Sequence, residues 1–206
     1  RRQRQMCIRD RYSLDGQVEL DDGFFTTERP EEEKDTPLKR GRGSQKKSKV
    51  VVMVESAPSQ RHPRKGKPSK VVGHLKMQVI PDLKTQTVTD VAKKHLEPSV
   101  ELTTDDSTSY HKLGEHVQKH QTVISDKKNV EKILPWVHIA ISNAKRLLLD
   151  MHHRIKHEYL QYYLNEFCYK FNRRYFGEKL FDRVVLAAIS YNTDFKSRTY
   201  RRTTCG

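Results

Sequence analysis

The chain has 206 residues, 40 of them Lys or Arg and 26 of them Asp or Glu, which leaves a formal net charge of +14. This length fits one domain with appendages and excludes a large multidomain protein. Its apolar runs are far shorter than the roughly 20 residues needed to cross a bilayer, so we expect no membrane partner. Each phosphate that Lys or Arg neutralises releases counterions, so a pI of about 9.7 predicts a polyanionic partner, nucleic acid first.

The three Cys residues form neither a disulfide framework nor a CxxC zinc pair. The N-terminus has no apolar stretch of the kind found in secretory signals. Together these features predict a cytoplasmic protein.

Strand patterns dominate the first half of the chain. Two-residue alternation predicts a strand from Gly16 to Phe25, with Asp21 and Phe25 on the same side. After an acidic loop, a basic stretch over residues 39–70 is interrupted by a second strand, KVVVMVES. A Pro/Gly/Lys-rich turn separates this strand from a third at residues 71–80, which predicts an antiparallel pair.

The remaining elements are predicted in the following order: a helix at 87–96, a strand at 99–104 that ends in carboxylates, a helix at 107–119, a strand at 121–125, and helical periods at 133–151, 159–171 and 180–189. This order predicts the α/β class, with a mixed five-stranded sheet flanked by helices and a helical C-terminal half. We expect residues 1–13 to be a disordered or artefactual leader, 14–192 the folded domain, and 193–206 a flexible basic tail.

Three polar residues fall where chemistry could be carried out: Asp21 in the first strand, Asp105 after the fourth, and Asn143 in the first long helix. If strands one and four are neighbours, Asp21 and Asp105 approach closely, and their charges then repel unless a cation lies between them. Magnesium prefers such oxygen ligands. With 26 acidic residues the chain offers many Asp pairs, so spacing alone does not select this one.

Four segments resemble, in order, the motifs of ISXO-like insertion-sequence transposases, members of the DDE superfamily with RNase H-like catalytic domains. They are VELDDGFF, LTTDDSTSYHKL, WVHIAISNAKR followed by MHHRI, and YLNEFCYKFNRR. The resemblance covers about residues 14–190. It implies an RNase H-like fold and DNA transposition, with Asp21, Asp105 and Asn143 as the catalytic and metal-binding residues.

The cofactor implied by the resemblance is magnesium, as two ions, with manganese as an alternative. These ions would activate water to nick the transposon end and then activate the freed 3′ hydroxyl to attack target DNA. The third family motif usually carries Glu where this chain has Asn143. A neutral amide binds magnesium more weakly than a carboxylate, so the site is either adapted to Asn or decayed.

The resemblance also implies that the partner is DNA, both as transposon ends and as target. It further implies a homo-oligomer in the active complex. The protein would be bacterial and cytoplasmic, and nucleoid-associated when bound to DNA. The zinc ribbon that normally precedes the catalytic domain in this family is not found, which predicts a fragment. Two alternatives stay open: a non-catalytic or decayed nucleic-acid-binding protein, and an RNase H-like nuclease without strand transfer.

Basic side chains from three regions are candidates for contacts with DNA phosphates. They are Arg40, Arg42, Lys46, Lys47 and Lys49, then Lys145 and Arg146, and finally Arg173 and Arg174. His153 is a candidate for lining the site. Asp22 and Asp106 are interpreted as solvated or capping residues.

Overall fold

The computed structural model describes residues 12–30, 33, 35–58, 70–124, 134–182 and 185–186. The chain divides into two units, and Ser13–Arg173 forms the larger one. In the smaller unit the structure describes a 3-10 helix, η4 (Arg174–Lys179), with a kink at Gly177, where φ is +51°. The larger unit contains the whole of the sheet.

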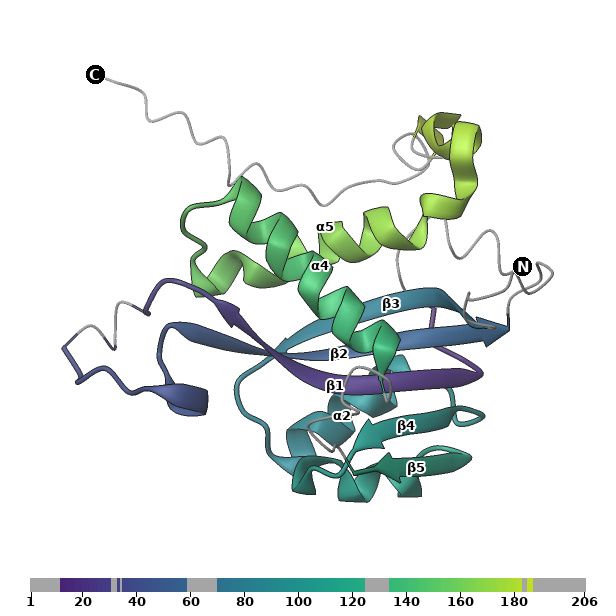
Figure 1. Ribbon diagram of the computed structural model, residues 1–206, viewed down its shortest axis with the longest axis horizontal. Coiled ribbons are helices and arrows are strands. Elements are labelled where there is room, and N and C mark those ends of the chain that lie inside the picture. Colours follow the sequence, from purple (N-terminus) through teal and green to yellow (C-terminus); the bar gives the residue numbers. More distant parts are fainter. Residues whose placement is uncertain are drawn as a thin grey trace. The chain divides into compact units, whose positions relative to one another are not determined.

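The larger unit is built on a five-stranded sheet in the order β3-β2-β1-β4-β5 (Figure 1). Its strands are β1 (Gln17–Thr26), β2 (Lys47–Pro58), β3 (Lys70–Ile80), β4 (Glu101–Asp105) and β5 (Lys119–Val123). The first three strands pair antiparallel, whereas β1, β4 and β5 run parallel. The mixed five-stranded sheet predicted from the sequence is therefore confirmed.

Helices cover both faces of this sheet. Helices α4 (Pro135–Met151) and α5 (His157–Asn172) pack on one face, whereas α2 (Thr85–His95) and the 3-10 helix η3 (Thr108–Glu115) pack together on the other. A further 3-10 turn, η2 (Gly41–Gly43), precedes β2. Among the described residues, no helix is both long and apolar enough to span a membrane.

The main core lies between the sheet and helices α4 and α5. Strand alternation directs Val50, Val52 and Val54 of β2 into this core, where they meet buried residues of α4 such as Val137 and Ile141. Each fully buried aliphatic side chain of this kind contributes roughly 1.5–3 kcal/mol relative to exposure. Packing thus holds α4 against the centre of the sheet.

Helix α5 is also attached to the edge strand β3 by polar side chains. The side-chain amide of Asn172 bonds both the N–H and the C=O of Leu75, at 2.8 and 2.9 Å. The Gln161 side chain accepts from the N–H of Val79 at 2.7 Å and donates to the C=O of Met77 at 3.0 Å. These bonds satisfy backbone groups at the sheet edge, which would otherwise be open to pairing with another chain.

Several predicted elements differ in detail. The helix predicted at 107–119 is the shorter 3-10 helix η3, whose buried residues Tyr110 and Leu113 are three apart, the spacing of a 3-10 turn. The strand predicted at 121–125 begins two residues earlier, as β5. The helix predicted at 180–189 falls partly outside the described residues, as do most of the predicted leader 1–13 and all of the tail 193–206.

Candidate active site

Asp21 and Asp105 lie on neighbouring parallel strands, as expected from the sequence. In the register of β1 and β4, Leu20 is paired with Thr104, so the next residue of each strand is one of the two aspartates. Residues paired side by side project to the same face of a sheet. Both carboxylates therefore project from the face that α4 covers. Both residues are half-buried.

Glu19 attaches the start of α4 to this part of β1. It is two residues before Asp21 and so faces the same side of the sheet. Its Oε2 accepts hydrogen bonds from the backbone N–H groups of Trp136 and Val137, at 2.9 and 3.1 Å. A carboxylate at this position satisfies otherwise unpaired N–H groups and interacts favourably with the helix dipole.

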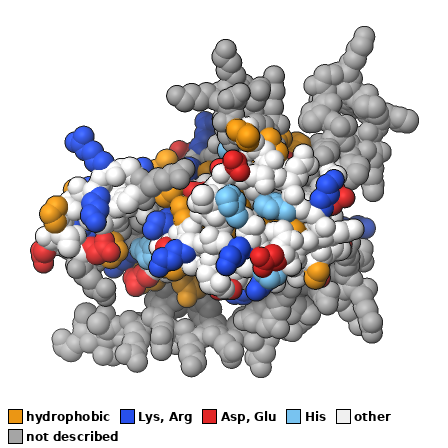
Figure 2. Space-filling view, turned by 90° about the horizontal axis from the view of Figure 1, so that it is seen from below, with side chains coloured by type: hydrophobic (Ala, Val, Ile, Leu, Met, Phe, Trp, Pro, Cys, Tyr) orange, Lys and Arg blue, Asp and Glu red, His pale blue; other side chains and the backbone are white. Residues whose placement is uncertain are grey.

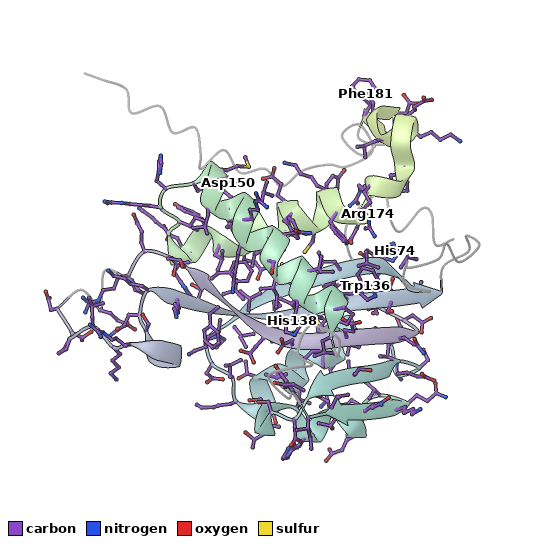
Figure 3. The ribbon with its side chains drawn as sticks, viewed as in Figure 1. His74, Trp136, His138, Asp150, Arg174 and Phe181 are labelled. Atoms are coloured by element: carbon purple, nitrogen blue, oxygen red, sulfur yellow. The ribbon has the colours of Figure 1, made fainter. Side chains whose placement is uncertain are left out.

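His138 of α4 lies close to Asp21. Its Nδ1 lies 3.8 Å from Asp21 Oδ2, and Figure 3 shows His138 and Trp136 near the end of α4 that overlies the sheet. Sequence reasoning did not select His138. The available signal was its spacing of two helical turns from Lys145, which places both residues on one side of α4.

Lys145 is the second cationic residue of α4 near Asp21. Partial burial, and after it the positive charge of Lys47, lowers the pKa of the Lys145 ammonium, whereas the charge of Asp21 acts in the opposite direction. Its Nζ also lies 5.7 Å from the centre of the Phe25 ring. The Lys145 ammonium is therefore close enough to both Asp21 and Lys47, at the start of β2, to be influenced by their charges.

Asn143 lies elsewhere on α4. It is five positions after His138, which corresponds to a rotation of roughly 140° around the helix axis, and it is exposed between Ile139 and Leu147, two exposed apolar residues of the same helix. The structure thus brings Asp21 and Asp105 together on one face and shows His138 within 3.8 Å of Asp21.

Asp22 belongs to the other face of the sheet. Its Oδ1 accepts a hydrogen bond from the Tyr110 hydroxyl at 3.0 Å. Burial raises the pKa of that hydroxyl, with further increases from the charges of Asp22, Asp21 and Asp105. A tyrosine that stays protonated is a permanent hydrogen-bond donor to Asp22, so this acid has a structural role in the core beneath the sheet.

Side-chain contacts also order the end of β4. Asp105 Oδ1 accepts from the backbone N–H of Ser107 at 3.3 Å. The buried Thr104 hydroxyl is 2.9 Å from His120 Nε2 and 2.9 Å from the carbonyl oxygen of Asp105, to which it donates. Burial, and then the charge of His111, lowers the pKa of His120, which favours a neutral ring beside Thr104.

Residues 13–172 match the model of the ISXO2-like transposase domain. The chain belongs to this transposase family. Its mixed sheet with flanking helices is the RNase H-like α/β fold expected for an insertion-sequence transposase of the DDE superfamily. Among proteins with curated descriptions, none matches the sequence significantly.

DDE transposases generally use divalent metal ions. In the parts of the chain that the structure describes, no group of three His, Cys, Asp or Glu side chains is arranged to hold one. Asp21 and Asp105 nevertheless suit magnesium, which is commonly bound through one or two carboxylates and takes its other ligands from water and substrate phosphates. The donors in this transposase domain are thus compatible with the expected ion.

The basic residues expected to contact DNA have different surroundings. Arg40, Lys46, Lys47 and Arg146 are exposed, and Lys49 donates to the carbonyl of Pro81 at 3.1 Å. Arg173 is only 4% exposed, and its guanidinium lies 3.5 Å from the centre of the Tyr169 ring. The Arg42 side chain is outside the described part, Arg174 belongs to the smaller unit, and His153 is exposed at the end of α4.

Proposed function

We propose that this chain is the catalytic part of a metal-dependent DNA transposase, which cuts a phosphodiester bond at the end of an insertion sequence and joins the freed 3′ hydroxyl to target DNA. The observation that carries the proposal is the parallel pairing of β1 with β4, since it puts Asp21 and Asp105 side by side on the face covered by α4. The family membership of residues 13–172 supports the reaction class.

In this proposal Asp21 and Asp105 hold magnesium, or manganese in its place. When bound, such ions stabilise the attacking and the leaving oxygen of an in-line phosphoryl displacement. Glu19 holds the start of α4 against β1, so that the first turn of the helix stays beside Asp21. Lys145 is placed to neutralise part of the charge of a phosphate near Asp21.

For the third position of the site we propose His138 in place of Asn143. Its imidazole is 3.8 Å from Asp21, too long for a hydrogen bond but short enough for both groups to contact the same water molecule or phosphate oxygen. His138 would then orient the attacking hydroxyl or accept its proton. Asn143, exposed on another side of α4, is less suited to this role.

The basic residues Lys46, Lys47 and Lys145 would bind the DNA backbone, whereas the buried guanidinium of Arg173 is better explained by packing on Tyr169. We expect the protein in the bacterial cytoplasm, associated with the nucleoid when bound to DNA. We also expect the active complex to be a homo-oligomer, because the two ends of one element must be processed together.

The decisive experiment compares Asp105→Asn with Asp106→Asn, its exposed neighbour. The substrate is a plasmid that carries the element's own ends, incubated with magnesium and a second, target plasmid. We expect the Asp106 variant to nick the ends and form joined products, and the Asp105 variant to do neither while still binding the DNA in EDTA. Cleavage by the Asp105 variant would contradict the proposal.

The same experiment separates the alternative functions. Nicking without joined products would indicate an RNase H-like nuclease that lacks strand transfer. Binding without any nicking, by the parent chain as well as by the variants, would indicate a nucleic-acid-binding protein or a decayed transposase.

A further inference from the structure

A cavity of about 840 Å³ lies beside the proposed active site. Its walls are the ends of β1 and β2, the last turns of α4, and residues 152–155, which lead into α5. Backbone hydrogen bonds fix these walls, from the N–H of Thr27 to the C=O of Lys46 at 3.0 Å and from the N–H of Glu28 to the C=O of Ile155 at 2.7 Å. A cavity of this size is within the range that encloses small ligands.

The cavity is lined by apolar side chains and by positively charged side chains. Phe25, Leu148 and Leu149 contribute apolar surface, while Lys46, Lys47, Lys145 and Arg154 contribute positive charge. Among the described residues of this lining, Glu28 is the one carboxylate. A ligand that matches such a surface has a flat apolar part and a negatively charged part, as a nucleotide does.

The cations of the cavity also lie close to one another. Lys47 is near enough for its charge to lower the pKa of Lys145, which is already depressed by burial. Two like charges in a partly buried place repel each other, and a phosphate between them removes this repulsion. An anion is thus favoured at this position more than at an isolated surface lysine.

The cavity is within reach of a DNA strand held at the proposed active site. Asp21, Gly23 and Phe25 follow one another on the same face of β1, and Phe25 lines the cavity. Four residues of a strand span roughly 13 Å, which equals about four nucleotides of a stacked DNA strand. Lys145 lines the cavity and is close enough to Asp21 to be influenced by its charge, so it lies near both sites.

We propose that this cavity binds an unpaired nucleotide of the DNA strand that the active site engages. The base lies against Leu149 and the apolar part of the lining, and the adjoining phosphates contact Lys47, Lys145 and Arg154. A duplex backbone would need only an open basic surface, whereas a cavity with an apolar wall suits a base outside the double helix. This proposal rests on the proposed function, because the strand is the one that Asp21 and Asp105 would cut.

The face of the described residues seen in Figure 2 has a mixed charge. On the face shown in Figure 2, Lys and Arg side chains are interspersed with acidic and His side chains. Lys93 and Lys94 on α2 lie on the opposite face of the sheet from the cavity and supply a control for general electrostatic attraction.

The test measures DNA binding by fluorescence anisotropy in EDTA, with the full chain and without cleavage. The probes are a blunt duplex and the same duplex with a three-nucleotide single-stranded overhang, at its 3′ or its 5′ end. We expect the parent chain to bind one overhang duplex about tenfold more tightly than the blunt one.

Leu149→Glu should remove this preference, because it places a carboxylate in the cavity. Leu149 is 66% exposed, so the change does little to the core. The matched control is Met151→Glu, which makes the same change of charge at a 60% exposed residue of α4 that does not line the cavity. It should weaken all probes equally and keep the tenfold preference.

Arg154→Gln provides a second variant, with Lys94→Gln as its control. Arg154→Gln should reduce the overhang preference at least threefold, and Lys94→Gln should leave it unchanged. An equal affinity of the parent chain for blunt and overhang duplexes would overturn the proposal, and so would an overhang preference that survives both cavity variants.

These results are independent of cleavage. If Asp105→Asn abolishes nicking while Leu149→Glu leaves the overhang preference intact, the proposed function stands and the cavity proposal fails. If the parent chain does not nick DNA but prefers the overhang duplex, and the Leu149→Glu variant lacks this preference, the cavity proposal stands and the proposed function fails.

Discussion

The imidazole of His138 lies 3.8 Å from the carboxylate of Asp21, so the first turn of α4 reaches β1 beside the proposed active site. The position that the family resemblance assigned to this role, Asn143, lies on another side of the helix. In the proposed function, this contact gives His138 access to a substrate held at Asp21.

We predict that His138→Ala lowers the rate of magnesium-dependent cleavage by about ten- to a hundredfold, the usual cost of losing a group that orients a metal site. Asn143→Ala should change the rate by less than about twofold, since its side chain is exposed. The measurement is single-turnover cleavage of a transposon-end duplex, with DNA binding in EDTA as a check on folding. The reverse order of effects would restore Asn143 to the site.

The two adjacent aspartates of β1 should behave differently. Asp21→Asn is expected to reduce cleavage more than about a hundredfold, because removing a ligand of the ion costs several kcal/mol of transition-state stabilisation. Asp22→Asn should retain most of the activity, because Asp22 faces Tyr110 on the other side of the sheet. Equal losses of activity in the two variants would mean that strand alternation does not separate their roles.

Glu19 should contribute to stability through its bonds to α4. We expect Glu19→Ala to lower the free energy of unfolding by about 1.5–3 kcal/mol, the range for hydrogen bonds to a charged group. The exposed Glu101 of β4 is the control, and Glu101→Ala should change the free energy of unfolding by less than about 0.5 kcal/mol. Urea denaturation gives both values. Similar small effects would show that other contacts suffice to hold α4.

Stability should also depend on pH through His95. Burial, and after it the charges of Lys76 and Lys94, lowers the pKa of its imidazole from 6.5 to about 4. The unfolded chain therefore binds a proton at His95 more readily than the folded protein does. The contribution of neutral His95 to the free energy of unfolding is complete above about pH 6.5 and is lost as the pH falls towards 4.

The test of this prediction is urea denaturation of the parent and of His95→Gln at pH 7 and pH 4.5. The parent should lose more free energy of unfolding than the variant between these values, because Gln does not titrate. Equal losses would indicate that His95 is protonated in the folded protein as easily as in the unfolded chain.

Local sequence patterns predict most of the strands of the sheet and the polar residues at their ends. The alternation in VELDDGFF put Asp21 and Phe25 on one face of β1, and the carboxylates after LTT marked the end of β4, because local side-chain period depends only on the backbone geometry of a strand. The motif order also identified the family. These features are local, so they can be read without knowing what packs against them.

Packing between distant segments sets which side of each element faces the site. The rotation of α4 depends on the core residues Val137, Ile141 and Ala144 and on the bonds of Glu19 to the start of the helix, and neither can be read from the helical period alone. That rotation brought His138 and Lys145 towards Asp21 and left Asn143 exposed. The burial of Arg173 against Tyr169 and the cavity at the end of β1 likewise result from contacts between segments far apart in the sequence.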